Sequence, residues 1–239
     1  ISGIIVSPHA AVDFCADQQF INNMTDNDIK LFMMHEETEW DGVSPVDHTK
    51  TIHEVEVEDL LPRKQITIDI EAIAHELSNK TILITGSAGS IGSEMVRQIA
   101  SFNPQCLVLI DQAETPQHDI RLMMADRWPH VKCQTIVASI CCQDHMEQLF
   151  KQHHPDYVFH AAAYKHVPMM EDNPSESVRN NILGTKNIAD LSVKYGVKKF
   201  VMISTDKAVN PTNVMGCSKR ICEMYVQSLD SAIKSGRVK

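Results

Sequence analysis

One stretch, Lys80 to Glu94 (KTILITGSAGSIGSE), constrains the fold of this chain more than any other. Its apolar run predicts a buried parallel strand over 81–85, and the apolar residues after the turn recur with helical period. Between them stand Gly86, Gly89 and Gly92, at three-residue intervals. Glycine allows a positive φ and a close approach of the backbone, and the first turn of a helix offers free N–H groups. This order of strand, glycine turn and helix predicts a site for the pyrophosphate of a dinucleotide.

Three glycines alone would also fit an ordinary tight turn, so a second feature is needed. Another apolar run, Cys106 to Ile110, predicts a buried strand that ends at Asp111. An acid at this distance from the glycines is typical of nucleotide-binding domains, where it contacts the hydroxyls of the adenosine ribose. The same carboxylate would repel a 2′-phosphate, and no Arg or Lys occurs within 112–117. The sequence therefore favours NAD over NADP as the cofactor.

Strands and helices alternate through the rest of the chain. We expect further strands over 134–138, 157–160 and 199–204, with long helices over 175–195 and 213–234. Because such crossovers are right-handed, the pattern predicts a doubly wound parallel α/β sheet with its ligands at the carboxyl ends of the strands. The expected cofactor contacts in the glycine turn and after the fourth strand are Gly86, Ser87, Ala88, Gly89, Ser90, Ile91, Gly92, Ala161, Ala162 and Ala163.

We expect three parts along the chain. Residues 1–58 read as the C-terminal portion of an upstream α/β domain, with apolar or strand segments over 3–7, 29–34 and 51–58 and a helix over 10–24. The chain looks cut from a longer polypeptide. Residues 59–78 read as a linker and a packing helix that Asp69 caps. Residues 79–239 form the predicted nucleotide-binding domain.

The composition limits the classes of function. A net charge of −9 over 239 residues disfavours a general nucleic-acid or anionic-membrane surface. No apolar run reaches the roughly eighteen residues that a membrane span needs, and the first residues lack the pattern of a signal peptide, so we expect a cytoplasmic piece without membrane contact. The seven cysteines include no C-x-x-C pair and read as free thiols. His153 and His154 lack metal-ligand spacing to other residues, so we predict no metal.

Candidate catalytic residues follow the fifth predicted strand. Thr205, Asp206 and Lys207 bring a hydroxyl, an acid and an amine to the sheet edge where the redox ring of a dinucleotide would lie. An ordinary loop ion pair would also explain Asp206 beside Lys207, but the position at a strand end favours a ligand. Met215 and Lys219 share a helical face where short-chain dehydrogenases have Tyr-x-x-x-Lys. Lys219 can hold the nicotinamide ribose, whereas the thioether of Met215 cannot take a proton.

Four blocks together resemble the nucleotide-sugar 4,6-dehydratases, a family of extended short-chain dehydrogenase/reductases with a Rossmann fold. They are TGSAGSIGSE at 85–94, AAAYKHVPMMEDNP at 161–174, NNILGT at 180–185 and STDKAVNPTNVMGCSK at 204–219. The likeness is strongest to the large membrane-anchored subgroup that makes UDP-4-keto-6-deoxy-N-acetylglucosamine and has methionine in place of the tyrosine. It implies UDP-N-acetylglucosamine as substrate, a homo-oligomer, and a parent protein on the cytoplasmic face of the inner membrane.

The resemblance implies a reaction without net redox change. Hydride leaves C4 of the sugar for NAD, water is lost across C5 and C6, and the hydride returns to C6. Asp206 would protonate the departing C6 hydroxyl, Lys207 would be the base at C5, and Thr205 would bind the C4 oxygen. The group that removes the C4 hydroxyl proton stays open among Asp206, Lys207 and a water held near Lys219.

The resemblance also assigns the remaining site residues. Lys165 and His166 would face the sugar, and Asn181 would support the geometry of the active-site helix beside them. Where many relatives have an Asp that contacts the adenine, this chain has Ser139 and Ile140, so that contact is weaker or comes from the backbone. Members of the family continue past position 239 with two more strands and the region that grips uridine diphosphate. Two alternatives therefore stay open, a 4-epimerase or reductase on the same scaffold and a non-catalytic NAD-binding module.

Overall fold

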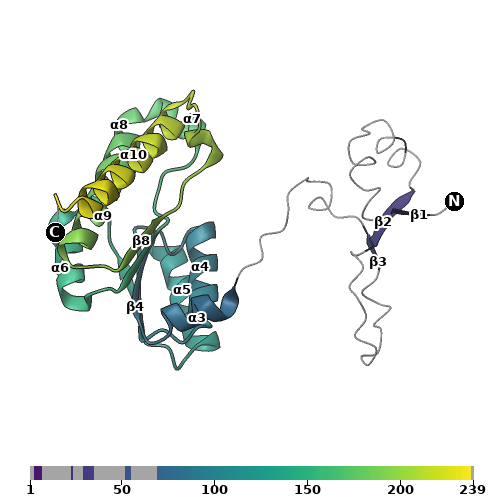
Figure 1. The fold of residues 1–239 in the computed structure, drawn as a ribbon, viewed down its shortest axis with the longest axis horizontal. Helices are drawn as coiled ribbons and strands as arrows, with labels where there is room; N and C mark the ends of the chain where they lie inside the picture. The colour runs from purple at the N-terminus through teal and green to yellow at the C-terminus, as the bar shows by residue number, and fades with distance from the viewer. Residues whose placement is uncertain (1–2, 7–22, 24–28, 35–51, 55–68, 238–239) are drawn as a thin grey trace. The chain divides into compact units, whose positions relative to one another are not determined.

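The computed structural model describes residues 3–6, 23, 29–34, 52–54 and 69–237, in two compact units, Ile1–Ile68 and Asp69–Lys239 (Figure 1). In the first unit, β1 (Gly3–Val6) pairs in parallel with β2 (Lys30–Met34), and β3 (Ile52–Glu54) pairs antiparallel with the other edge of β2. The strands expected within 29–34 and 51–58 are therefore present, the second of them shorter than predicted. The helix expected over 10–24 lies outside the described residues except for Asn23.

The second unit contains a five-stranded parallel sheet. Its strands are β4 (Thr81–Thr85), β5 (Cys106–Asp111), β6 (Cys133–Val137), β7 (Tyr157–His160) and β8 (Lys199–Met202). They lie side by side in the order β6-β5-β4-β7-β8, and every neighbouring pair is parallel. The chain order changes direction at β4, between β5 and β7. In a doubly wound sheet a ligand binds in the crevice at such a switch point, so the predicted Rossmann fold is confirmed.

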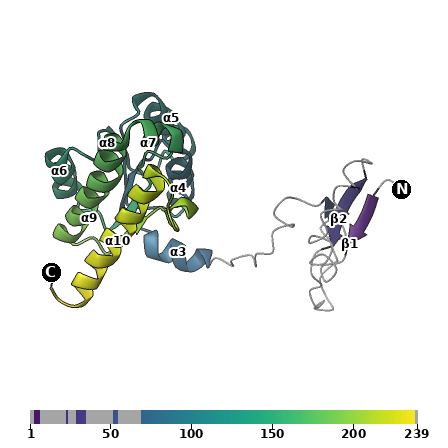
Figure 2. The ribbon, with the colours of Figure 1, turned by 90° about the horizontal axis from the view of Figure 1, so that it is seen from above.

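Helices cover both faces of this sheet, and alternate side chains of the strands fill the two cores (Figures 1 and 2). Ile82 and Ile84 pack beneath α3 (Ile70–Leu77), α4 (Ser90–Ala100) and α5 (Glu114–Arg127). Leu83, between them, points to the other face, towards Phe150 and Ile188 of α6 (Gln143–His153) and α9 (Gly184–Lys194). Each of these strand residues is fully buried, because both faces of a parallel sheet are covered.

The helix α3 begins, as predicted, at an Asp69 cap, whose carboxylate accepts the Ala72 N–H at 2.9 Å. Only part of its apolar face is buried, because Leu77 lies in the core while Ile70 is 62% exposed. Glu76 accepts hydrogen bonds from Lys199 Nζ at 2.7 Å and from the Tyr157 hydroxyl at 3.3 Å. These bonds attach α3 to the starts of β7 and β8.

The segment between β7 and β8 differs from the single long helix expected over 175–195. A separate helix, α7 (Val167–Asp172), comes first, and the chain then forms α8 (Pro174–Glu176), a π-helical segment (Ser177–Leu183) and α9. Pro174 lacks an N–H group and disfavours helical geometry at Asn173, which separates α7 from α8. A hydrophobic pattern cannot distinguish the wider π turn from an α turn, so the sequence did not indicate it.

The last helix, α10 (Val214–Lys234), matches its prediction closely. The Asn213 side chain caps it by accepting the Gly216 N–H at 2.7 Å. The helix packs against α7, the π-helical segment and α9 (Figure 2). Within the described part of the chain, no helix has both the length and the apolar character to cross a membrane.

Candidate active site

The glycine turn, Gly86 to Gly92, follows β4 and holds three chain segments in close contact. Gly86 has φ +70°, and a Cβ there would lie 2.5 Å from the Ala162 nitrogen. A Cβ at Gly92 would lie 1.9 Å from the Gly86 carbonyl oxygen. Positions 86 and 92 therefore require glycine, because the segment after β7 and the first turn of α4 both press on the turn. This contact brings the predicted loop 161–163 to the start of α4.

A cavity of about 520 Å³ opens over this turn. Ser90, Ile91 and Gly92 form the first turn of α4, whose N–H groups have no partner inside the helix. Lys165 reaches the same place, with its Nζ 3.5 Å from the Ser90 hydroxyl. Free N–H groups, the positive end of a helix and a cation together suit a pyrophosphate. The cavity is lined by Gly86, Gly89, Ser90, Ile91, Gly92, Ala161, Ala163, Tyr164, Lys165, His166, Met169, Met170, Asn173 and Glu176.

Asp111 stands at the end of β5 beside the glycine turn. Its two carboxylate oxygens accept the N–H groups of Ala88 at 3.0 Å and Ala113 at 2.9 Å. The carboxylate is therefore held in one orientation and keeps lone pairs for a ribose hydroxyl. Ser87, in contrast, is fully buried, and its hydroxyl donates to Gln117 Oε1 at 2.9 Å. The Ser87 side chain thus supports the turn from inside the protein instead of facing the cavity.

Of the two residues expected near an adenine, Ile140 points into the protein. It is 4% exposed, packs against Gly184, and its carbonyl accepts from the Asn187 amide at 2.8 Å. The Ser139 hydroxyl accepts the Cys141 N–H at 3.3 Å. Of these two residues, only Ser139 can therefore offer a side chain to an adenine, since Ile140 belongs to the core.

Thr205, Asp206 and Lys207 lie just past β8, at the same edge of the sheet as the glycine turn. β8 is two strands from β4, and two strand spacings amount to about 10 Å. Asp206 Oδ1 accepts from the Thr205 hydroxyl at 2.8 Å and from Lys207 Nζ at 3.4 Å. These bonds, the hydroxyl first, hold the pKa of Asp206 below its usual range. The carboxyl is 84% exposed and ionised near neutral pH.

Lys219 and Met215 are buried residues of α10, the helix that packs against the segment Asp206–Ala208. Lys219 is 6% exposed, and its Nζ donates to the Ile203 carbonyl at 2.6 Å. Burial lowers the pKa of Lys219. A buried amine with a perturbed pKa at the ligand edge of a sheet is typical of a functional group. Met215 is 3% exposed and occupies the tyrosine position of the motif with an apolar side chain.

Asn181 connects the π-helical segment to two other parts of the site. Its amide donates to the Tyr164 carbonyl and to the Ser218 hydroxyl, both at 3.0 Å, and its Oδ1 accepts the Tyr164 N–H at 2.8 Å. The residue is 1% exposed. Its polar atoms are therefore engaged within the protein, which fits the expected support of the active-site helix and not direct contact with a sugar. Lys165 and His166 are exposed and line the cavity.

With this geometry described, the chain can be compared with known proteins. Residues 82–239 match the sequence profile of the family described as polysaccharide biosynthesis protein. The chain belongs to this family. It is 47% identical over 180 residues to the "Capsular polysaccharide biosynthesis protein CapD" of Staphylococcus aureus, over 75% of this chain and 30% of that protein. The chain thus spans less than a third of the length of that relative.

Two further proteins share part of this sequence or its fold. The "UDP-N-acetylglucosamine 4,6-dehydratase (inverting)" of Campylobacter jejuni is 33% identical over 143 residues, which cover 59% of this chain and 41% of that protein. The crystal structure of a UDP-glucose 4-epimerase from Thermotoga maritima, solved with UDP-glucose, superimposes with a TM-score of 0.54 at 28% identity, over 62% of this chain and 50% of that one. The resemblance drawn from the four sequence blocks is therefore confirmed at the level of the family.

One buried histidine was not among the predicted site residues. His160 ends β7 and lies between two threonine hydroxyls, Thr85 Oγ1 at 2.6 Å and Thr185 Oγ1 at 2.8 Å. Its ring also stacks on Phe200. Burial, and next the charge of Lys219, lower the pKa of His160 to about 3, so the imidazole is neutral. The register of β4 and β7, which pairs Thr85 with His160, would have indicated the first of these two contacts.

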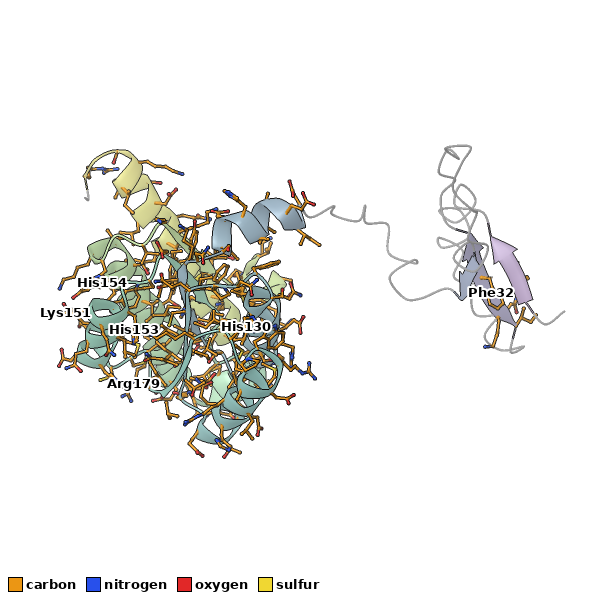
Figure 3. The ribbon with its side chains drawn as sticks, turned by 90° about the horizontal axis from the view of Figure 1, so that it is seen from below. Phe32, His130, Lys151, His153, His154 and Arg179 are labelled. Atoms are coloured by element: carbon orange, nitrogen blue, oxygen red, sulfur yellow. The ribbon has the colours of Figure 1, made fainter. Side chains whose placement is uncertain are left out.

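The remaining histidines form no metal site within the described residues. His153 and His154 lie together at the end of α6, close to Lys151 (Figure 3). Among the side chains that the structure describes, no group of three or more His, Cys, Asp or Glu could hold a metal ion. Tetrahedral zinc sites need four such ligands, or three and a water.

Proposed function

We propose that this protein is an NAD-dependent nucleotide-sugar 4,6-dehydratase that converts UDP-N-acetylglucosamine into its UDP-4-keto-6-deoxy derivative. The observation that carries the proposal is the trio Thr205, Asp206 and Lys207 at the sheet edge that also bears the glycine turn. A hydroxyl, a carboxylate and an amine within hydrogen-bonding distance of one another can move the protons that an elimination requires. The name of the Campylobacter jejuni relative supports the same reaction.

The residues around the cavity fit NAD. The first-turn N–H groups of α4 would bind its pyrophosphate, Asp111 its adenosine ribose, and Lys219 its nicotinamide ribose. A 2′-phosphate would meet the Asp111 carboxylate, which favours NAD over NADP. When bound, this cofactor takes up hydride from C4 of the sugar and returns it at C6.

The ionised state of Asp206 supports a role for it in both proton transfers of the sugar hydroxyls. As a carboxylate it can take the C4 hydroxyl proton while hydride leaves C4, a step for which Met215 has no suitable atom. The carboxylic acid so formed then protonates the C6 hydroxyl as water departs. Lys207, in its neutral amine form, takes the C5 proton to become an ammonium and returns that proton to C5 when hydride reaches C6. The Thr205 hydroxyl would orient the C4 oxygen. In this scheme the C4 hydroxyl proton ends in the released water, and both side chains regain their starting states.

The test uses the full-length protein with NAD and UDP-N-acetylglucosamine. We expect a 4-keto-6-deoxy nucleotide sugar, and we expect Asp206→Asn to abolish it while NAD binding persists, because an amide cannot accept and return a proton. Asp190→Asn, on the outer side of α9, is the matched control and should keep activity, since Asp190 pairs with surface partners in α9 and α10. Full turnover by Asp206→Asn would contradict the proposal.

A 4-epimerase is the second candidate, because the Thermotoga maritima epimerase shares this fold at 28% identity. Such enzymes normally keep the tyrosine that Met215 replaces here, and they lack the adjacent Asp206 and Lys207. The same incubation separates the two reactions. An epimerase would produce UDP-N-acetylgalactosamine, with no keto sugar.

A further inference from the structure

The segment that follows β8, Ile203 to Lys207, is here called the strand exit. It is held against α10 at three successive points. At the first point, Gly216 lies close to the Lys207 carbonyl, since a Cβ at position 216 would be 2.2 Å from that oxygen. At the second, Lys219 Nζ donates to the Ile203 carbonyl at 2.6 Å. At the third, Glu223 Oε1 accepts from the Ser204 hydroxyl at 2.6 Å. Positions 216, 219 and 223 share one face of the helix, so this face fixes the backbone on both sides of Thr205 and Asp206.

Glu223 is the charged member of this set that no part of the proposed reaction uses. Both of its carboxylate oxygens are engaged, Oε1 with Ser204 and Oε2 with Arg220 at 2.9 Å. The side chain is 20% exposed. A distance of 2.6 Å between a hydroxyl and a carboxylate oxygen is typical of a charge-assisted bond, about twice as strong as a neutral one.

The two bonds of Glu223 differ in what they can do. The Arg220 pair spans three residues of one helix, and exposed pairs of that kind contribute little to stability. The Ser204 bond joins residues nineteen positions apart and connects α10 to the strand exit. Ser204 directly precedes Thr205, so a displacement of Ser204 moves the whole trio. A misplacement of about 1 Å at a reacting group can cost roughly a hundredfold in rate.

We propose that Glu223 is a positioning residue of the active site, which acts through Ser204 to hold Thr205, Asp206 and Lys207 in their working arrangement. It touches neither the sugar nor NAD. The proposal rests on the dehydratase function above, and it adds a residue to that site. In chemical terms, the Glu223 carboxylate, one turn after Lys219 in α10, accepts a hydrogen bond from Ser204 and so fixes the strand exit.

The first test compares Glu223→Ala, Ser204→Ala and the double variant in the full-length protein. Each single change should lower kcat by about tenfold or more, with KM for UDP-N-acetylglucosamine and Kd for NAD within twofold of wild type. The double variant should be no worse than the singles, because the two residues act as a unit. Glu223→Gln, which keeps an acceptor oxygen, should recover part of kcat. Asp230→Asn is the control, since it breaks an ion pair with Lys234 on the same helix, far from the trio, and should leave kcat unchanged.

A second measurement does not depend on turnover. The N–H groups of Lys207, Ala208 and Val209 bond within the short turn after β8, to Thr205 Oγ1, the Thr205 carbonyl and the Asp206 carbonyl. Glu223→Ala should speed their hydrogen exchange at least fivefold, while amides of β4 exchange as before. If the wild-type protein makes no keto sugar, the dehydratase proposal fails, and exchange still tests the positioning. Unchanged exchange, or a kcat for Glu223→Ala within twofold of wild type, would overturn the inference.

Discussion

Replacement of Gly92 by alanine tests the contact between α4 and the glycine turn. The new Cβ would lie 1.9 Å from the Gly86 oxygen and 2.7 Å from the Gly86 carbonyl carbon, where ordinary contact begins at 3.4 Å. Backbone atoms cannot move aside as a flexible side chain can, so the helix start must shift by about 1.5 Å. Overpacking of this kind costs about 1–3 kcal/mol. For a unit of this size, that cost lowers Tm by roughly 2–12 °C.

The same shift should weaken cofactor binding. Displacement of the Ser90 and Ile91 N–H groups by more than 1 Å breaks at least one hydrogen bond to a charged phosphate, which is worth about 1.5–3 kcal/mol. We expect the Kd for NAD, measured by titration calorimetry, to rise about 10- to 100-fold. Gly196→Ala is the matched control, because Gly196 has φ +68° but nothing within 4 Å of its Cβ position. It should lower Tm slightly and leave the Kd unchanged. A Gly92→Ala protein with wild-type Tm and Kd would refute this account of the turn.

Three other predictions concern buried groups. The pKa of His160 is about 3 when folded and about 6.5 when unfolded. Its contribution to the free energy of unfolding is therefore full above pH 6.5 and falls towards pH 3, by up to about 1.4 kcal/mol per pH unit. His160→Gln should flatten the fall of Tm between pH 6.5 and 4. Lys219→Met should weaken NAD binding at least tenfold in calorimetry, because it removes the amine that would hold the nicotinamide ribose. Asn181→Leu leaves the Tyr164 backbone groups without partners and should cost about 1–3 kcal/mol in urea unfolding.

The parts of the fold that the sequence predicted are those encoded by local pattern. The strand 81–85, the glycine turn, the Asp69 cap and the helix over 213–234 depend on residues close together in the chain, and all are present. The separate helix α7 and the π-helical segment were missed. Propensity does not distinguish a π turn from an α turn, and tertiary hydrogen bonds from Asn181 accompany the π segment.

Among the site residues, too, the positions set by local pattern could be predicted and those set by tertiary contacts could not. Asp111 and the trio after β8 could be predicted because they follow strands whose carboxyl ends meet at one edge. The inward directions of Ser87 and Ile140 could not, since they depend on Gln117 in α5 and on Gly184 in α9. The bond between Ser204 and Glu223 is likewise long-range. Its one local signal was that Glu223 stands four residues after Lys219, on the same helical face.

The central claim is that NAD held at the glycine turn and the trio Thr205, Asp206 and Lys207 act on one nucleotide sugar. The most direct test of this claim follows the C4 hydrogen. The full-length protein is incubated with NAD and UDP-N-acetylglucosamine that carries deuterium at C4, and the product is examined by NMR and mass spectrometry. We predict a 4-keto sugar with the deuterium in its C6 methyl group. Deuterium retained at C4 of an epimer, or a keto sugar with no deuterium at C6, would contradict the claim.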